Sequence, residues 1–377
     1  MNEVYRCVHC GFCLPTCPTY LATGSEGHSP RGRLYIIRAV LEGRAEPRGR
    51  ALEYLDSCVY CLRCETACPS GVKYGQVYRE FMKRYPALGG VTYGRYMPLF
   101  NLLNTSLGLA AARAAPLKAI REVASGGDVA PLVGRVYKAK GERRGRVVLY
   151  FSKRCIAWRW RRDVVEAAVR VLTWNGFEVA TGDFHCCGAP YSHAGRFKKA
   201  HALAKENLKT LRRLGPFDAV VVPNSGGCQA ELLDYVDGVY DVLQFLGERG
   251  LRGELGPLEL RIAVQHSCHL ANVAKAHRHV VEVLSRIPGL QLVELPSADV
   301  CCGGGNMYSL RHRRVADAIL EIKKREIDAV SPHGVLIESP ACVQQLSRLP
   351  YPLYYPVVLL DMSYRRGGNV GYGELNL

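Results

Sequence analysis

The sequence of 377 residues has no run of eighteen or more apolar residues, the length that a membrane-spanning helix requires. The longest candidate, residues 96–112, is interrupted at Pro98, Asn101, Asn104 and Gly108. The first residues, MNEVYRCVHC, lack the apolar segment of a secretory signal. We therefore expect a protein of the reducing cytoplasm, where cysteine-rich segments indicate metal or redox chemistry more often than disulfides.

Acidic residues are also few: 34 Asp and Glu stand against 50 Lys and Arg, which gives a net charge of +16. Such a charge suits an acidic protein partner or an anionic membrane surface, and some of it could balance metal-bound thiolates. The basic residues are scattered and no nucleic-acid motif accompanies them, so we expect no nucleic acid partner. The glycine-rich CGGGN of residues 302–306 lacks the G-x-G-x-x-G spacing of a dinucleotide loop.

Cysteine, by contrast, is abundant, with sixteen residues. Two runs share the spacing C-x2-C-x2-C-x3-C-P: CVHCGFCLPTCP at residues 7–18 and CVYCLRCETACP at residues 58–69. In bacterial two-cluster ferredoxins with this spacing, three cysteines bind one [4Fe–4S] cluster and the fourth binds the other. Structural zinc would need neither the third cysteine nor the trailing proline. We predict one cluster at Cys7, Cys10, Cys13 and Cys68, and another at Cys17, Cys58, Cys61 and Cys64.

A helix is expected between the two runs, in SPRGRLYIIRAVLEG. Ser29 suits the N-cap, Pro30 the first helical position and Gly43 the stop. The helix carries three arginines, Arg31, Arg33 and Arg38. They either tune the reduction potential of a cluster or form a solvated basic face.

Beyond residue 144 a second cysteine pattern occurs twice, at a spacing of 113 to 115 residues that indicates duplicated domains rather than a solenoid. Each copy alternates short apolar segments with helical patterns, which predicts an α/β domain with a mainly parallel sheet. The pattern comprises Cys155, Cys186, Cys187 and Cys228 in the first copy, and Cys268, Cys301, Cys302 and Cys342 in the second.

The adjacent Cys-Cys pairs are poor candidates for disulfides. Neighbouring Cα atoms lie about 3.8 Å apart, whereas a relaxed disulfide prefers roughly 4.4–6.8 Å. In each copy the cysteines follow predicted strands, and parallel strands bring such positions to one edge of the sheet. We therefore expect each set of four thiolates to hold a metal centre, with an iron–sulfur cluster as the first candidate. The alternatives are zinc, an empty pair of buried thiols and a redox-active dithiol.

Three histidines lie beside these cysteines: His185, His266 and His269. Each could donate a hydrogen bond to a sulfur or carry a proton, and for each a purely structural role is the alternative.

The chain resembles the glycolate oxidase iron–sulfur subunit family along nearly its whole length, least so in residues 90–145. The resemblance is carried by CVHCGFCLPTCPTY, SPRGRLYIIRAVLEG, CETACPSGVKYG and CCGGGNMYSL. The iron–sulfur subunits of D-lactate utilisation, of anaerobic glycerol-3-phosphate dehydrogenase and of heterodisulfide reductase share the architecture.

The resemblance implies the electron-transfer subunit of an oxidoreductase complex. A flavoprotein dehydrogenase partner would oxidise a 2-hydroxy acid such as glycolate or D-lactate, and this chain would pass the electrons toward the quinone pool or another carrier. It would not oxidise the substrate by itself. The alternatives are a glycerol-3-phosphate dehydrogenase iron–sulfur subunit, a thiol–disulfide reductase and a zinc-bearing scaffold without activity.

The chain departs from the heterodisulfide reductases at the C-x-x-C motif that ends their Cys-Cys-Gly domain. Here Ser225 and Ser339 stand at the first of those positions. The loss of that thiolate in both copies favours simple electron transfer over disulfide reduction, and it leaves the type of cluster open.

The expected fold class is α+β and multidomain: a helical ferredoxin domain (residues 1–90), a linker (91–144) and two α/β Cys-Cys-Gly domains (145–252 and 253–377). The linker segment of residues 95–123 mixes apolar and basic residues. It suits either a bridging helix or an interfacial helix that attaches the protein to the inner face of the cytoplasmic membrane.

Overall fold

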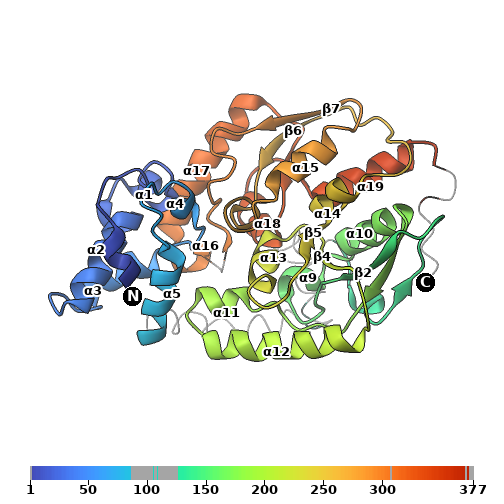
Figure 1. The fold of residues 1–377 in the computed structure, drawn as a ribbon. Helices are drawn as coiled ribbons and strands as arrows, with labels where there is room; N and C mark the ends of the chain where they lie inside the picture. The colour runs from blue at the N-terminus through green and yellow to red at the C-terminus, as the bar shows by residue number, and fades with distance from the viewer. Residues whose placement is uncertain are drawn as a thin grey trace.

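The computed structural model describes residues 2–85, 105, 108, 126–305, 308–369 and 372 (Figure 1). Most of the expected linker, including the segment of residues 95–123, lies outside the described residues. Among the residues that are described, no helix combines the length and the apolar character needed to cross a bilayer.

The N-terminal domain is helical, as predicted, and residues 2–85 contain no strand. Its small core is filled by side chains such as Ile37, Val77 and Phe81, which have no exposed surface. Its elements are η1 (Asn2–Arg6), α1 (Pro18–Thr23), η2 (Glu26–His28), α2 (Pro30–Leu41), α3 (Gly49–Asp56), α4 (Arg63–Thr66) and α5 (Tyr74–Arg84).

Helix α2 is the helix expected between the two cysteine runs. The Ser29 hydroxyl accepts a hydrogen bond from the backbone N–H of Gly32 at 3.0 Å, so it caps the helix, and Pro30 occupies the first turn. The helix ends at Leu41, and Gly43 follows with a φ of 71°, a conformation that favours glycine. Local sequence therefore determines both ends of α2.

The first α/β domain contains a five-stranded sheet in the order β1-β3-β2-β4-β5, parallel except for the β1–β3 pair. Strand β1 lies within the range expected to be linker. The elements are η3 (Ala130–Leu132), β1 (Val136–Tyr137), β2 (Gly145–Leu149), α9 (Ile156–Arg159), α10 (Arg162–Trp174), β3 (Phe177–Thr181), α11 (Ala189–His193), α12 (Phe197–Arg213), β4 (Ala219–Val222), α13 (Gly226–Leu232), β5 (Val239–Asp241) and α14 (Val242–Arg249).

The second α/β domain has a four-stranded, fully parallel sheet in the order β7-β6-β8-β9, which matches the order of the last four strands of the first sheet. The duplication seen in the cysteine spacing is therefore a duplication of topology. The elements are β6 (Leu260–Gln265), η4 (Leu270–Ala274), α15 (His277–Leu284), β7 (Leu290–Glu294), α16 (Tyr308–Arg311), α17 (Arg313–Val330), β8 (Gly334–Ile337), α18 (Pro340–Leu346), β9 (Leu353–Tyr354) and α19 (Pro356–Arg366).

The two α/β domains share one continuous hydrophobic core. Helix α19, from the end of the second domain, packs on α10 of the first, and α14 packs on α15. In the α10–α19 contact the guanidinium of Arg170 donates to both carboxylate oxygens of Asp361, at 2.8 and 2.9 Å. Both side chains are largely buried. The first domain is therefore covered in part by the last helix of the second.

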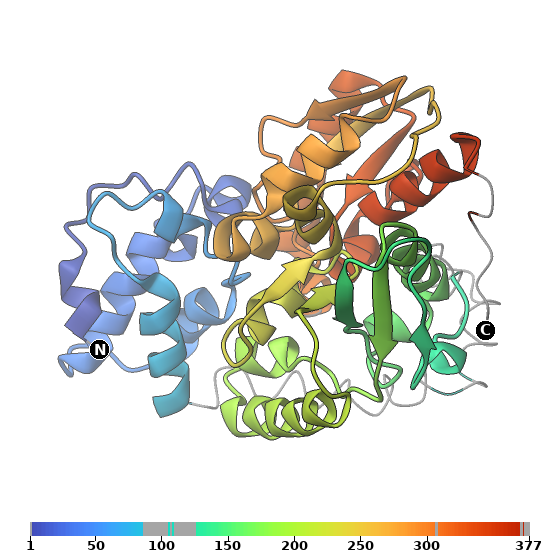
Figure 2. The same ribbon diagram turned by 45° about the vertical axis from the view of Figure 1, so that its right-hand side comes forward.

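The N-terminal domain docks mainly on the second α/β domain, where α1 packs against α17 (Figures 1 and 2). The Tyr308 hydroxyl donates to the carbonyl of Ser57 at 2.9 Å, and Arg311 and His312 both contact the Asp56 carboxylate. The first α/β domain also contacts the N-terminal domain, in part through the ion pair of Arg79 with Asp234.

The buried pair between the repeats yields a stability prediction. Asp361→Ala leaves the Arg170 charge buried without its carboxylate, so we expect a loss of about 3–5 kcal/mol in the free energy of unfolding. The control is Glu46→Ala, because Glu46 and Arg48 form an ion pair that is 65% and 81% exposed. It should change stability by less than about 0.5 kcal/mol. Equal unfolding midpoints for the two variants in anaerobic thermal scans would contradict the prediction.

Candidate metal centres

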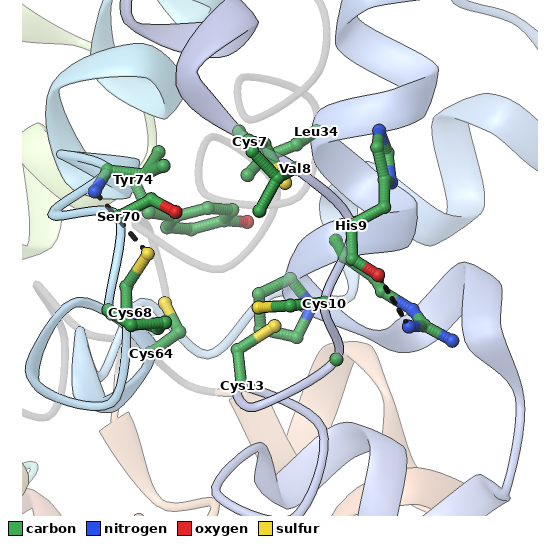
Figure 3. Close-up of a pocket in the computed structure, with 15 residues that line it drawn as sticks. Cys7, Val8, His9, Cys10, Cys13, Leu34, Cys64, Cys68, Ser70 and Tyr74 are labelled. Atoms are coloured by element: carbon green, nitrogen blue, oxygen red, sulfur yellow. Dashed lines mark hydrogen bonds between the residues drawn. The ribbon is translucent and has the colours of Figure 1, made fainter.

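The first cysteine site is a cavity of about 420 Å³ that opens to solvent at the end of the N-terminal domain. Figure 3 shows sulfurs from both cysteine runs directed into the same space. The lining cysteines are Cys7, Cys10, Cys13, Cys64 and Cys68.

The second site is a cavity of about 300 Å³, deeper in the same domain. Pro30, Cys64 and Tyr74 line both cavities, so the two sites are direct neighbours. The cysteines of the second cavity are Cys17, Cys58, Cys61 and Cys64.

The two runs thus exchange their fourth cysteines. Cys68, the last of the second run, lies with the first run, and Cys17, the last of the first run, lies with the second. This is the crossing expected for a two-cluster ferredoxin, and the thiol-lined cavities fit [4Fe–4S] clusters. Cys64 borders both cavities, and the assignment of each cysteine to one cluster stays a prediction. Within the described residues, no three His, Cys, Asp or Glu side chains are grouped tightly enough for a single metal ion.

Several hydrogen bonds orient the sulfurs. Cys58 Sγ accepts from the backbone N–H of Tyr60 at 3.4 Å and from the hydroxyl of Tyr74 at 3.3 Å. Cys68 Sγ accepts from the N–H of Val72 at 3.4 Å. Hydrogen bonds to sulfur ligands favour the reduced, more negative state of a cluster, so these donors would raise the reduction potential of a cluster held at either site.

The structure distinguishes the three arginines of α2. Arg31 is paired with Glu26, Arg38 is paired with Glu42, and both lie at the surface. Arg33 is only 1% exposed and lies beside the second cavity. Arg31 also lines the first cavity, whereas Arg38 lines neither cavity. Of the two roles left open by the sequence, a surface face suits Arg38, whereas Arg31 and Arg33 are placed to act on a cluster.

Arg33 makes its hydrogen bonds to neutral groups and a thiol. Its guanidinium donates to the Tyr54 carbonyl at 2.7 Å and to the hydroxyls of Thr19 and Ser57 at 3.0 and 3.1 Å. It also reaches Cys17 Sγ at 4.0 Å. Burial alone would lower the pKa of Arg33, but the interactions with Cys58, Tyr74 and Cys17 together outweigh burial and the pKa is raised. Thiolates are therefore the natural counter-charge of this buried guanidinium.

In each α/β domain the four cysteines meet at the carboxyl edge of the sheet, as predicted from their positions after strands. All sixteen cysteines of the chain are free. Hydrogen bonds link the thiols in series, from the first cysteine through the Cys-Cys pair to the last. These contacts run through Cys155, Cys186, Cys187 and Cys228 in the first domain, and through Cys268, Cys301, Cys302 and Cys342 in the second.

These contacts divide the thiols of each domain by pKa. Hydrogen bonding from Cys155 lowers the pKa of Cys186, and hydrogen bonding from Cys187 lowers that of Cys228. In the second domain, hydrogen bonding from Cys301 lowers the pKa of Cys268 to about 5 and also lowers that of Cys302. The same hydrogen bonds, with burial, raise the pKa of Cys155 and Cys187 in the first domain and of Cys301 and Cys342 in the second. Each domain therefore places thiols and thiolates side by side at one point, and thiolates are the donors of an iron–sulfur cluster.

Ser225 and Ser339 stand where the heterodisulfide reductases have a cysteine, and each makes a hydrogen bond close to its own position in the chain. Ser339 Oγ accepts from the N–H of Ala341 at 3.3 Å and so caps α18. Ser225 stands at the N-cap of α13, and its hydroxyl is a hydrogen-bond partner of Cys228.

The three histidines differ in surroundings. His266 Nδ1 is 2.9 Å from Oε1 of the buried Glu338, which is a structural pairing. His269 Nδ1 lies 3.6 Å from Cys268 Sγ, so this ring contacts a predicted ligand. His185 is held through its backbone N–H, which donates to Asn207 at 2.9 Å.

A junction between all three domains was not foreseen from the sequence. The rings of Tyr60 and His193 lie 4.9 Å apart, and His193 stacks on His269 at 4.9 Å with an angle of 12°. Asn272 Nδ2 donates to the carbonyl of Cys61 at 3.2 Å. The contacts join segments that are far apart in the chain, and no local pattern signals them.

Comparison with known proteins gives the same division of the chain. The family of 4Fe-4S dicluster domains matches residues 3–72, and the family described as Cysteine-rich domain matches residues 149–232 and 262–347. The probable glycolate oxidase iron-sulfur subunit of Bacillus subtilis (strain 168) is 28% identical, with 92% of this chain and 88% of that protein covered.

Two further relatives also span most of the chain. The glycolate oxidase iron-sulfur subunit of Escherichia coli (strain K12) is 29% identical, with 90% of this chain and 89% of that protein covered. A subunit of the fumarate reductase (CoM/CoB) of Methanothermobacter marburgensis is 24% identical, with 90% of this chain and 67% of that protein covered.

The chain is thus an iron–sulfur protein in which a dicluster domain, holding two [4Fe–4S] clusters, is joined to two cysteine-rich domains. It contains two domains of the cysteine-rich family and is similar to glycolate oxidase iron–sulfur subunits over 90% or more of its length, which confirms the resemblance in its sequence.

The exchange of fourth cysteines is tested by single substitutions. We expect Cys68→Ala to impair the solvent-exposed cluster and Cys17→Ala the buried one, each with a loss of about four irons per chain. The cluster that survives in Cys17→Ala should therefore be bleached faster by a chelator than the one that survives in Cys68→Ala. The assignment is contradicted if the order of bleaching is reversed.

The burial of Arg33 predicts a change in reduction potential. Arg33→Gln removes a buried positive charge beside Cys17 and Cys58, so the potential of the buried cluster should fall. The control is Arg38→Gln, because Arg38 is paired with Glu42 at the surface of the same helix, lines neither cavity, and its loss should have a smaller effect. Both are measured by redox titration followed by EPR. Equal shifts in the two variants would show that burial of the charge is irrelevant.

Proposed function

We propose that this chain is the electron-transfer subunit of a flavin-dependent 2-hydroxyacid oxidoreductase complex of the glycolate or D-lactate type. A flavoprotein partner oxidises the substrate, and this chain relays the electrons toward the quinone pool or another acceptor. The proposal rests chiefly on the sequence of sites: a solvent-exposed cysteine site, a buried neighbour, and a second α/β domain that adjoins this neighbour.

The residues of the chain supply the electrostatics of the relay. A [4Fe–4S] cluster, when bound, accepts and releases single electrons. The cysteine thiolates hold it, the N–H and hydroxyl donors orient the sulfurs, and the Arg33 guanidinium balances negative charge at the second site. Burial of Cys17 and Cys61 keeps water away from that site.

The first site offers a docking face for the flavoprotein. Cys10 is exposed, and Val8 and Phe12 beside it are 70% and 65% exposed. Apolar side chains around an exposed redox centre suit a protein partner that must approach closely. Electrons would then pass from this face inward.

Localisation in the cytoplasm is part of the proposal, because free thiols of this number need a reducing compartment. The net charge of +16 suits peripheral contact with the inner face of an anionic membrane, through residues 95–123. Such contact would bring the acceptor end of the relay close to the quinone pool.

A glycerol-3-phosphate dehydrogenase iron–sulfur subunit would use the same relay, and only the partner would differ. A thiol–disulfide reductase is less favoured. It requires a substrate sulfur to reach a cluster, whereas Cys187, Cys301, Cys302 and Cys342 are buried. Ser225 and Ser339 also remove the extra thiolate of the heterodisulfide reductases.

The test combines analysis of the isolated chain with reconstitution. Anaerobically purified protein should contain about twelve to sixteen irons if one or both repeats are occupied, and about eight if they are empty. Alone, it should neither oxidise glycolate or D-lactate nor reduce a disulfide with reduced viologen. With a co-expressed flavoprotein dehydrogenase, its EPR signals should appear on addition of the 2-hydroxy acid. Disulfide reduction by the isolated chain would instead favour the reductase.

A further inference from the structure

The two repeats differ at one buried position that faces their cysteine pairs. Four of the five buried side chains of α12 recur as buried side chains of α17 at a constant offset of 116 residues, and three of these four pairs are apolar. The four pairs comprise Ala200, Ala204, Asn207 and Leu211 in α12, and Ala316, Leu320, Lys323 and Ile327 in α17. Asn207 of the first repeat therefore corresponds to Lys323 of the second.

Asn207 is a neutral partner of the first cysteine pair. Its side chain is fully buried, and its Nδ2 donates to the carbonyl of Cys186 at 3.2 Å and to the Tyr150 hydroxyl at 3.2 Å. Its Oδ1 accepts from the N–H of His185. Every polar atom of the amide is used, and the position carries no charge.

Lys323 brings a positive charge to the second cysteine pair. It is 1% exposed, and its Nζ donates to the carbonyl of Ser297 and, at 2.7 Å, to the Ser297 hydroxyl. Burial lowers its pKa, while the negative charges of Glu326, Cys302 and Cys301 oppose that shift. The ammonium is thus buried within electrostatic range of Glu326 and of the cysteine pair, in which the pKa of Cys302 is lowered.

The buried carboxylates also differ between the repeats. Glu231, three residues after Cys228, accepts from the Ser192 hydroxyl and lies close enough to Cys186 for their charges to interact. Its counterpart three residues after Cys342 is Gln345, a fully buried neutral amide. At these corresponding positions the first repeat has no cation and one carboxylate, whereas the second has one cation and no carboxylate.

One buried carboxylate of the second repeat acts in the opposite sense. Glu338 corresponds to Asn224 of the first repeat and influences Cys342. Glu338 is itself engaged, however, by His266 at 2.9 Å and by the N–H of Ser267 at 2.9 Å. Asp241, bound by Asn224, adds a buried carboxylate to the first repeat. Glu326, which aligns with Thr210 of the first repeat, acts on Lys323 as a counter-charge, and its carboxylate accepts from the Ser297 hydroxyl. Among these residues the first repeat has two carboxylates and no cation, whereas the second has two carboxylates and one cation, so the second is the more positive.

The second repeat is also the one next to the buried ferredoxin site. Asn272 donates to the carbonyl of Cys61, and Arg63 forms an ion pair with Asp299. Burial raises the pKa of Cys61, and the negative charge of Cys268 raises it further, which places these two cysteines within electrostatic range.

We propose that Lys323 raises the reduction potential of the second-repeat centre above that of the first, and so makes the second repeat the acceptor of electrons from the buried ferredoxin site. The inference rests on the proposed function. In the step, Cys17, Cys58, Cys61 and Cys64 would hold the cluster that gives up one electron and is oxidised. The second-repeat centre takes up that electron and is reduced. The flavoprotein partner is the original reductant.

The experiment is a redox titration of the whole, anaerobically purified chain at pH 8, followed by EPR. Cys342→Ala assigns the second-repeat signal by its loss. Lys323→Gln should shift the midpoint of that signal to lower potential and leave the two ferredoxin midpoints unchanged. The matched control is Lys324→Gln, because Lys324 is the next residue of α17 but lies at the surface, paired with Asp328. It should shift no midpoint.

A second variant tests the same argument in the other repeat. Burial raises the pKa of Glu231 to about 7, so its carboxyl is mainly ionised at pH 8. Glu231→Gln should therefore raise the midpoint of the first-repeat centre, and this variant remains informative if Lys323→Gln fails to fold.

Three results would overturn the proposal: a wild-type second-repeat midpoint below that of the first, an unchanged midpoint in Lys323→Gln, or no signal lost in Cys342→Ala. Failure of the proposed function is a separate result. In that case the ferredoxin clusters would stay oxidised when flavoprotein and 2-hydroxy acid are added, whatever the order of the midpoints.

Discussion

The mutual repulsion of closely spaced thiolates is the constraint on which the rest of this structure depends. Sixteen cysteines are gathered into four sites, and at each one several negative charges approach one another inside the protein. Such an arrangement persists only with compensating charge and hydrogen bonds. The backbone N–H groups, the Tyr74 hydroxyl, Arg33 and Lys323 supply them. The folded domains hold these donors in place around the sulfurs.

Much of the fold could be predicted from the sequence because its signals are local. The cap at Ser29, the strand–helix alternation and the repeated cysteine spacing all depend on residues close together in the chain. Burial depends on tertiary contacts, which the sequence shows less directly. The arginines of α2 look alike in the sequence, and only packing against Tyr54, Thr19 and Ser57 makes Arg33 different.

Lys323 illustrates a signal that was present but weak. It lies at helical spacing from Ile319, Leu320 and Ile327, which places it on the buried face of α17. Most of its neighbours in EIKKRE are charged, however, so the local sequence suggests that Lys323 is exposed to solvent. Aligning α17 with α12 distinguishes it, because the aligned residue is Asn207 among apolar positions. The contact of the Cys58–Cys64 loop with the second repeat has no counterpart in local sequence and depends on how the domains dock.

The position of helix α19 makes the two repeats depend on each other. It belongs to the second repeat in the chain, yet it lies on α10 of the first and is tied there by Asp361 and Arg170. Leu359, Leu360 and Tyr364 have no exposed surface in this position. A chain that stopped before Pro356 would therefore leave an apolar stripe of the first repeat open to water. Neither half is an autonomous module, although their sequences share one pattern.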